Sequence, residues 1–327
     1  MKKICFIVSL ALLACNGTKS TVSSESNSVS ESTAVGKTYV VNQEEVSKTL
    51  QFLTSDDLEG RNTGSAGIEK ASYFLEDTFK KNGVKPYFKT YRDTLSNYDL
   101  PAYNMVGYIE GNDPKLKNEF VVIGAHYDHI GRIQAVNGDD IGNGANDNAS
   151  GTTAVTEVVK YFAKHKTNKR SIIFAFFSAE EKGLLGSKHL AKKLKEQNIN
   201  LYFMFNYEMI GVKMNREDML LYLTGFGKSN MAKKMNEYAE ENLIGYIPAE
   251  TQYQLFRASD NYPFYTEFEV PAQTVSTFDF ENFQFYHQPD DEFELMDTVH
   301  MTNVINKTIP VLEKMMNAAT KEIQMNK

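Results

Sequence analysis

The sequence predicts an α/β fold, a three-layer sandwich in which helices flank a mixed, largely parallel central sheet. One observation behind this prediction is that continuous apolar runs, typical of buried strands, alternate with segments of helical periodicity. Another is that acidic residues and histidines directly follow several of those runs. Ligand sites in such sheets lie at the carboxyl ends of the strands, so both observations fit one architecture.

The individual elements follow from local patterns along the chain. The first helix is expected at 42–52, where Asn42 is a suitable N-cap, and the second at 66–81, just before Gly83. Strands are expected at 87–91, 104–109, 121–123, 171–177, 201–205, 219–223 and 272–276, and further helices at 152–163, 184–194, 229–242 and 299–316.

Composition and charge exclude one class of partner. The 327 residues are enough for a large core, and 42% hydrophobic with 24% charged residues is ordinary for a globular protein. The net charge of -7 argues against nucleic-acid binding, which usually needs a basic surface. We expect one folded domain over residues 38–327.

The N-terminus predicts export. Two lysines precede an apolar run at 4–14 that is too short to span a bilayer, and the run ends in Leu-Leu-Ala-Cys15. This ending resembles the lipobox of bacterial lipoproteins, in which the cysteine is lipidated and becomes the mature N-terminus. Residues 1–15 are therefore expected to be a lipoprotein signal peptide, and the protein to be anchored in the bacterial cell envelope, on the periplasmic or outer-membrane side. An ordinary cleaved signal peptide is the alternative.

Residues 16–37 are rich in Ser, Thr and Glu, a composition typical of a flexible tether between membrane and domain. Cys5 and Cys15 are the only cysteines, so the mature domain has no disulfide and no thiol ligand. Any metal must therefore be held by His, Asp and Glu.

The stretch from Val121 to Gly151 carries the strongest chemical signal. An apolar strand ends with His126 and Asp128, and a polar, glycine-rich excursion then returns Asp147 just before a helix. Imidazole and carboxylate groups gathered at the end of a strand are the ligands that borderline divalent cations prefer.

Three other expected strands end in groups of the same kind. Glu180 and Glu181 follow the strand 171–177, Glu208 follows 201–205, and His287 comes after the last strand and a loop rich in Phe. Carboxylates gathered at one edge of a sheet repel one another unless a cation lies among them. The sequence thus predicts a pair of metal ions at this edge.

These motifs, taken in order, resemble those of the co-catalytic two-zinc aminopeptidases, the M28-type metallopeptidases, a family that also contains glutamate carboxypeptidases and glutaminyl cyclases. The similarity covers roughly residues 50 to 300. It rests on HxD at 126–128, NDNASG at 146–151, SAEEKGLLGS at 178–187, NYEM at 206–209 and YHQPDD at 286–291.

The resemblance implies a role for each motif residue. His126 and Glu208 would bind one metal, Glu181 and His287 the other, and Asp147 would bridge both. The cofactor would be two Zn²⁺ per chain, with another divalent metal possible. Glu180 would be the general base, and Asp128 would accept the second N–H of the His126 imidazole.

The chain departs from the family's pattern in two places. Glu208 stands where the peptidases usually have Asp, which leaves the metal identity open. In the stretch 257–264, also similar to bacterial members, Asn261 stands where relatives often have His. From that stretch Arg257 and Asp260 are expected to contact the substrate.

Simpler interpretations exist for several of these residues. Glu180 and Glu181 could be a solvated charge pair at a helix start, and Asp147 could cap the following helix. His129, which lacks a motif, is expected to have only a surface or packing role, as are His165, His189 and His300. The aromatic cluster 278–286 is expected to pack in a loop or core, with a substrate-side wall as the alternative.

The favoured function is a zinc aminopeptidase that removes N-terminal residues from peptides. The alternatives are carboxypeptidase-type cleavage or glutaminyl cyclisation on the same scaffold, and a non-catalytic binding module. The complete ligand set and the intact Glu180 favour the first.

Overall fold

The structure of the chain is a computed structural model that describes residues 40–326. The expected signal peptide, the lipidated Cys15 and the tether 16–37 lie outside the described residues. Within residues 40–326, none of the helices combines the length and the apolar character that crossing a bilayer requires.

A mixed sheet forms the centre of the domain. Nine of the described strands pair in it, in the order β1 (Lys85–Pro86), β3 (Tyr103–Ile109), β7 (Ser171–Phe177), β4 (Glu119–His126), β8 (Asn200–Tyr207), β11 (Ala272–Ser276), β9 (Leu221–Leu223) and β10 (Ile244–Gly245), with β2 (Arg92–Thr94) beside β3. The four central strands β7, β4, β8 and β11 are mutually parallel, whereas β3 and β9 join them antiparallel. All four central strands therefore end at the same edge.

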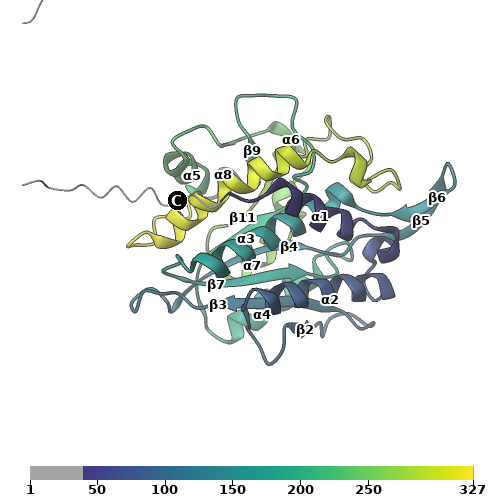
Figure 1. Cartoon of the computed structure of the whole chain (residues 1–327). Coiled ribbons are helices and arrows are strands. Elements are labelled where there is room, and N and C mark those ends of the chain that lie inside the picture. The colour runs from purple at the N-terminus through teal and green to yellow at the C-terminus, as the bar shows by residue number, and fades with distance from the viewer. Residues whose placement is uncertain (1–39, 327) are drawn as a thin grey trace, which may run out of the picture. The chain divides into compact units, whose positions relative to one another are not determined.

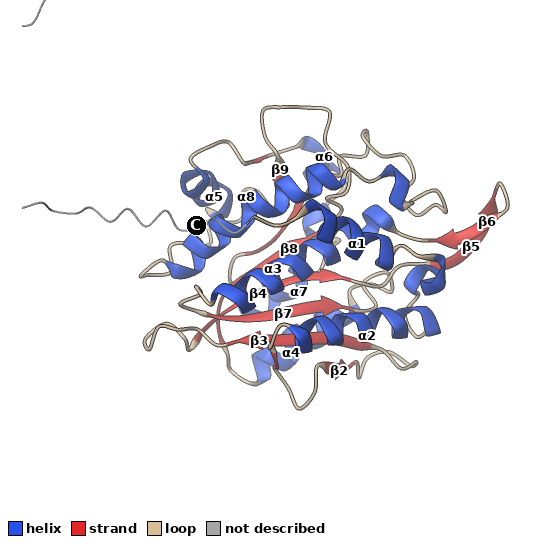
Figure 2. Ribbon diagram, viewed as in Figure 1, coloured by secondary structure: helices blue, strands red, loops and turns tan. Residues whose placement is uncertain are grey.

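Helices cover both faces of the sheet, as Figures 1 and 2 show. One face packs against α1 (Gln43–Leu53), α2 (Ala66–Lys81), α3 (Gly151–His165), α5 (Met231–Ala239) and α8 (Thr298–Asn317), and the other against α4 (Leu185–Glu196) and α7 (Asn261–Phe268). The shorter elements are α6 (Pro248–Gln252), η1 (Asp56–Arg61), η2 (Ala145–Ser150), η3 (Leu255–Arg257) and η4 (Phe293–Leu295). The predicted three-layer α/β architecture is confirmed.

The side-chain alternation of β4 explains why there are three layers. Val121, Ile123 and Ala125 are fully buried among the five-helix side, whereas Val122 is buried with Leu190 on the α4 side. Successive side chains of a strand point to opposite faces, so an unbroken apolar run must be covered on both. Full burial of each Val or Ile contributes about 1.5–3 kcal/mol.

The sequence prediction lacked α7 and the short strands β1, β2 and β10, and it differs from the structure in two further stretches. Residues 87–91 are not a strand: they form an irregular connection between β1 and β2, where Tyr87 packs edge-on against Phe88 and Tyr108. Aromatic packing satisfies the apolar pattern there without a ladder of backbone hydrogen bonds. The polar excursion 131–142 is a projecting hairpin of β5 (Gly131–Val136) and β6 (Asp139–Gly142), turning at Asn137-Gly138, a typical tight-turn pair.

A buried arginine ties three segments together behind the sheet edge. The Arg61 guanidinium donates hydrogen bonds to the carbonyl oxygens of Tyr127 at 2.9 Å, Asn143 at 2.7 Å and Gly144 at 3.0 Å, and also to that of Leu53. The planar, always charged guanidinium can hold several carbonyl oxygens at once. This clamp fixes the chain on both sides of the stretch that carries His129, and its last contact, at Gly144, lies just before Asp147.

Candidate metal centre

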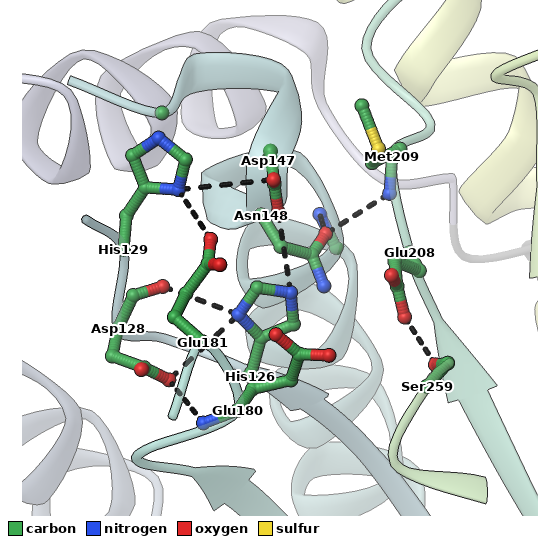
Figure 3. A network of polar contacts seen from close by, with 12 residues as sticks. His126, Asp128, His129, Asp147, Asn148, Glu180, Glu181, Glu208, Met209 and Ser259 are labelled. Atoms are coloured by element: carbon green, nitrogen blue, oxygen red, sulfur yellow. Dashed lines mark hydrogen bonds and ion pairs between the residues drawn. The ribbon is translucent and has the colours of Figure 1, made fainter. Parts of the chain in front are cut away.

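The sheet edge where the four parallel strands end brings the predicted ligands together. Two groups of side chains have ligand atoms within 4.8 Å of one another: His126, Glu180 and Glu208 form one, and His129, Asp147, Glu181 and His287 form the other. Figure 3 shows the members of the two groups that follow β4, β7 and β8 or lie in the turn before α3, gathered in one region: His126, His129, Asp147, Glu180, Glu181 and Glu208. All five predicted metal ligands belong to these two groups.

Asp147 lies between the two groups. Its Oδ1 is 3.3 Å from Nε2 of His126, and its Oδ2 is 3.2 Å from Nε2 of His287. The two oxygens of one carboxylate thus face two different imidazoles, the arrangement that a bridging ligand requires.

The turn before α3 gives Asp147 this position. The Asp291 carboxylate accepts the backbone N–H groups of Asn146 at 2.7 Å and Asp147 at 3.1 Å. Oδ1 of Asn148 accepts the N–H of Gly151 at 3.0 Å at the start of α3. Because Asn148 and not Asp147 satisfies this helix terminus, the Asp147 carboxylate is left for the site.

The second group is completed by Glu181 and His287. Oε2 of Glu181 lies 3.2 Å from Nε2 of His287, equal to the distance from that nitrogen to Asp147 Oδ2. Glu181 stands in a tight turn after β7, in which Gly183 and Leu184 donate backbone hydrogen bonds to the carbonyl of Glu180 at 2.8 Å. The two glutamates therefore precede α4 and are not its first turn.

The first group gathers around His126, the last residue of β4. Glu208 follows β8, where its N–H donates to Val275 of β11 at 3.1 Å, and its Oε2 accepts a hydrogen bond from the Ser259 hydroxyl. Glu180 completes the group. Its carboxylate is close enough to His126 and Glu208 to serve either as a ligand of a shared metal or as a base beside it.

The hydrogen-bond partner of His126 differs in one detail from the expectation. Nδ1 of His126 lies 3.1 Å from the backbone oxygen of Asp128 but 3.8 Å from its carboxylate. The carboxylate instead accepts the N–H of Glu180 at 3.1 Å and the Thr63 hydroxyl at 3.0 Å. Asp128 therefore orients the ring through its carbonyl and fixes the backbone of Glu180 through its side chain.

His129 is the residue that sequence reasoning missed. It was expected on the surface or in simple packing, yet its side chain is fully buried and Nδ1 lies 2.9 Å from Oε1 of Glu181. The sequence does contain a feature that points to His129, because this residue directly follows the HxD motif. The HxD motif ends at Asp128, so its spacing does not include His129.

The spacing of the ligand atoms fits zinc. Tetrahedral Zn²⁺ with bonds of about 2.0–2.1 Å places neighbouring ligand atoms about 3.3 Å apart. The three contacts among His126, Asp147, Glu181 and His287 measure 3.3, 3.2 and 3.2 Å. Nε2 of His126 and Nε2 of His287 are buried without a regular hydrogen bond among residues 40–326. A buried imidazole nitrogen without a hydrogen-bond partner is suited to bind a metal ion.

In the metal-free protein, protons bound to the clustered side chains supply the positive charge that metal ions would otherwise provide. Burial, together with the charges of Asp147 and Asp260, raises the pKa of Glu208 to about 8. Burial also raises the pKa of Glu180 well above its usual value, with the charges of Glu208 and Asp260 adding to it. Burial would lower the pKa of His287, but its contacts with Asp147 and Glu181 outweigh this and raise it to about 10. A cluster that stabilises protons on ligands has excess negative potential, which a dication would neutralise.

A small cavity opens beside Glu208. It measures about 70 Å³, and residues from β8, β9, β11, the η3 segment and the loop after β11 line it: Glu208, Met209, Tyr222, Thr224, Leu255, Ala258, Ser259, Thr274, Ser276, Phe278, Phe280 and Tyr286. Tyr286 stacks on the His287 ring at 4.0 Å, and Phe278 stacks on Tyr286 at 5.5 Å. The aromatic cluster 278–286 thus walls a cavity at the metal centre as well as packing in its loop.

The two predicted substrate contacts lie in different surroundings. Asp260 is fully buried, and its charge contributes to the raised pKa values of Glu180 and Glu208. Burial raises the pKa of Asp260 itself to about 7. Arg257 is exposed and lines a wider surface cavity with residues such as Lys228 and Glu250, next to η3.

The fold and the site together define a class, the α/β metal-dependent hydrolases with paired carboxylate and imidazole ligands at the carboxyl ends of a parallel sheet. Residues 104–310 match the model of Peptidase family M28, which covers more than half of the chain. The chain belongs to this family.

Individual relatives agree with this assignment. The chain is 30% identical to aminopeptidase YwaD of Bacillus subtilis over 184 residues (54% of this chain and 36% of that protein). It is 29% identical over 177 residues to a probable zinc metalloprotease of Pyrenophora teres f. teres, covering 51% of this chain and 35% of the relative. The alignments thus span about a third of the length of these curated relatives.

Solved structures share the fold. LapA aminopeptidase of Legionella pneumophila superposes with a TM-score of 0.66 at 23% identity, over 86% of this chain and 73% of that one. A zinc aminopeptidase of Bacillus subtilis gives 0.64 at 16% identity, over 88% and 98%. The glutaminyl cyclase of Porphyromonas gingivalis also gives 0.64, at 16% identity, over 84% and 99%. At these identities the superpositions establish the architecture alone.

Zinc binding to the metal-free protein is expected to release protons. Glu208 and His287, with pKa values of about 8 and about 10, hold protons at pH 7 and must lose them to act as ligands. Calorimetric titration of zinc at pH 7 in buffers of different ionisation enthalpy should show the release of at least one proton. Binding heats that do not depend on the buffer would contradict this protonation pattern.

The same pKa shifts make the metal-free fold less stable as pH rises. A group whose pKa is higher in the folded than in the unfolded state holds extra protons when folded, and this stabilisation is lost as pH rises through the folded pKa. Thermal unfolding of the metal-free protein should therefore occur at lower temperature at pH 9 than at pH 6. Saturating zinc should remove most of that difference.

Proposed function

We propose that this protein is a zinc-dependent aminopeptidase that hydrolyses N-terminal residues from peptides. The observation that carries the proposal is the position of Asp147, whose two oxygens face the imidazoles of His126 and His287 at 3.3 and 3.2 Å. This bridging geometry calls for two cations, His126 and Glu208 holding one and Glu181 and His287 the other. Two zinc ions there would polarise the scissile carbonyl and lower the pKa of a water between them.

Glu180 is suited to move the proton. It accepts a proton from the attacking water and donates it to the leaving amine, as general acid–base catalysis requires. Its raised pKa, caused first by burial, favours a carboxyl group that can retain the proton between the two steps. The hydrogen bond from its N–H to Asp128 at 3.1 Å holds its backbone in place.

The cavity beside Glu208 is suited to bind an apolar side chain of the substrate. Phe278, Phe280, Leu255 and Ala258 contribute to its lining, and its volume of about 70 Å³ suits a side chain of moderate size rather than a long peptide. Burial of an apolar side chain in such a pocket contributes about 1.5–3 kcal/mol. The preferred substrates are accordingly peptides with an apolar N-terminal residue.

Other reactions on the same scaffold are weaker candidates. Carboxypeptidase-type cleavage and glutaminyl cyclisation are the enzymatic alternatives, and a binding module would need neither the base nor the bridging ligand. The retained Glu180, His126 and His287 favour the two-metal peptidase. Assays that compare free and blocked N-termini separate it from the other reactions.

We further infer that the protein acts at the bacterial cell envelope as a lipid-anchored enzyme. The support is the N-terminal sequence: a basic start, a short apolar run and the lipobox-like Leu-Leu-Ala-Cys15. A Ser- and Thr-rich tether at 16–37 would then connect the anchor to the peptidase domain.

Substitution of the base and of the bridging ligand should have different consequences. Glu180→Gln is expected to keep two zinc ions and lower kcat about 10²- to 10⁴-fold, because only proton transfer is removed. Asp147→Asn should lose bound zinc as well as activity. Metal content by mass spectrometry and initial rates on aminoacyl substrates measure both effects.

The control is Glu157→Gln, a buried carboxylate of α3 paired with Lys160 outside the metal groups. This variant should keep wild-type rates and metal content. Unchanged turnover in Glu180→Gln would exclude it as the base, and loss of zinc would make it a ligand instead.

Filling the cavity should change the substrate preference. Ala258→Leu is expected to reduce kcat/KM for leucyl substrates about tenfold or more relative to alanyl substrates, because the larger side chain competes for the same volume. The exposed Gln252→Leu in α6 serves as the matched control. An equal loss for both substrates in Ala258→Leu would argue against this cavity as the side-chain pocket.

Loss of the cysteine should release the protein from the membrane. When the full chain is expressed in a bacterium, the wild type is expected in the detergent phase of a Triton X-114 partition. Cys15→Ala should move to the aqueous phase, since the acyl chains that anchor it are missing. A wild-type protein found only in the aqueous phase would contradict lipidation.

A further inference from the structure

His129 belongs to the second group of side chains, although it lies outside the sequence motifs that predicted the site. Its side chain is fully buried at the end of the segment after β4. Nδ1 lies 2.9 Å from Oε1 of Glu181, within hydrogen-bonding distance. An ionised carboxylate can only accept, so this nitrogen carries the proton and donates it.

Because of this contact, the two carboxylate oxygens of Glu181 have different partners. Oε1 is occupied by His129, whereas Oε2 faces Nε2 of His287 at 3.2 Å. Only Oε2 has the spacing to its neighbour that a shared tetrahedral ion demands, about 3.3 Å. His129 thus determines which oxygen of Glu181 is available as a ligand.

The distances from Nδ1 do not suit this nitrogen of His129 as an additional ligand. Its Nδ1 is 2.9 Å from Glu181 Oε1 and 3.8 Å from Asp147 Oδ2, one shorter and one longer than the expected edge between ligand atoms. The shorter contact is an ordinary hydrogen-bond length.

The surrounding backbone holds the His129 ring in place. The N–H of His129 donates to the carbonyl of Arg61 at 3.3 Å, within the segment that the Arg61 guanidinium clamps. Gly144 makes room for the ring, because a Cβ at that position would lie 2.5 Å from two ring atoms. The ring also meets His287 edge-on at 5.6 Å. These contacts give the donor one orientation.

Glu181 needs such a partner for two reasons. A free glutamate side chain loses rotamer entropy when it is fixed in one conformation. The neighbouring charge of Asp147 also repels it, whereas the contact with His129 favours its ionised form. A prior hydrogen bond lowers the cost of placing the carboxylate at the metal.

We propose that His129 is a positioning residue for the second metal. Its Nδ1–H holds Oε1 of Glu181, so that Oε2 is the oxygen left to bind the ion. This inference rests on the proposed two-zinc function. It assigns a role to a histidine outside the motif set.

The test compares two substitutions at this position. His129→Leu removes the donor, whereas His129→Asn keeps one, because the Asn amide nitrogen and the His Nδ1 are both attached to Cγ. Zinc affinities of the full chain are measured by competition with a fluorescent chelator, and stoichiometry by mass spectrometry. His129→Leu should bind the first zinc normally and the second about 10- to 100-fold more weakly. His129→Asn should recover the second affinity to within about threefold.

Two controls keep the result interpretable. His300→Leu alters another buried histidine, in α8 outside both metal groups, and should bind both ions as the wild type does. Thermal unfolding of the metal-free variants shows whether each one folds. A folded His129→Leu that keeps wild-type affinity for both ions overturns the inference, and so does a His129→Asn as weak as His129→Leu, since a ligand or packing role would not be rescued by an amide.

The outcome for the wild type separates this inference from the proposed function. If the wild type binds fewer than two zinc ions, the two-metal proposal fails and the role of His129 fails with it. If the wild type binds two and His129→Leu also binds two tightly, only the role of His129 is lost.

Discussion

The constraint on which the rest of the structure depends is the crowding of negative charge at one edge of the sheet. Asp147, Glu180, Glu181 and Glu208 lie in two adjoining groups that three histidines complete. Such a cluster is stable only with compensating positive charge, supplied by protons in the metal-free protein and by cations when metal is bound. The raised pKa values of Glu208 and His287 are the direct sign of this demand.

The scaffold holds the crowded carboxylates in place through hydrogen bonds to their backbone. Asp291 holds the backbone of Asp147, Asp128 holds that of Glu180, and Asn148 satisfies the start of α3. The Arg61 guanidinium lies behind them and binds carbonyl oxygens, so it adds positive charge near the cluster without occupying a ligand position. Site geometry is thereby set before any ion arrives, which lowers the cost of organising the ligands.

The cavity beside Glu208 and the second group of side chains share one short segment of the chain. The Tyr286 ring lines the cavity and also stacks on His287, a member of that group. The loop after β11 therefore contributes both to the wall of the cavity and to the candidate metal centre.

The sequence by itself determined the layers and predicted most members of the two candidate metal groups. Apolar runs and the helical period of 3.6 residues are local properties, so the strands β3, β7 and β11 and the helices α2 and α8 were predicted nearly as the structure has them. Most members of the groups were recognisable because they follow a buried strand within a motif. Residues 87–91 were wrongly predicted as a strand and the β5–β6 hairpin was missed, because aromatic packing and turn geometry, not periodicity, decide these segments.

Only the tertiary structure decided which atoms meet. Whether His126 bonds to the carboxylate or to the carbonyl of Asp128 depends on a few tenths of an ångström that no spacing encodes. The burial of His129 against Glu181 depends on the space that Gly144 leaves, fifteen residues further along the chain, and on a turn after β7. Contacts between segments distant in sequence are fixed by packing, and for this reason the roles of individual oxygens and nitrogens emerge only from the folded chain.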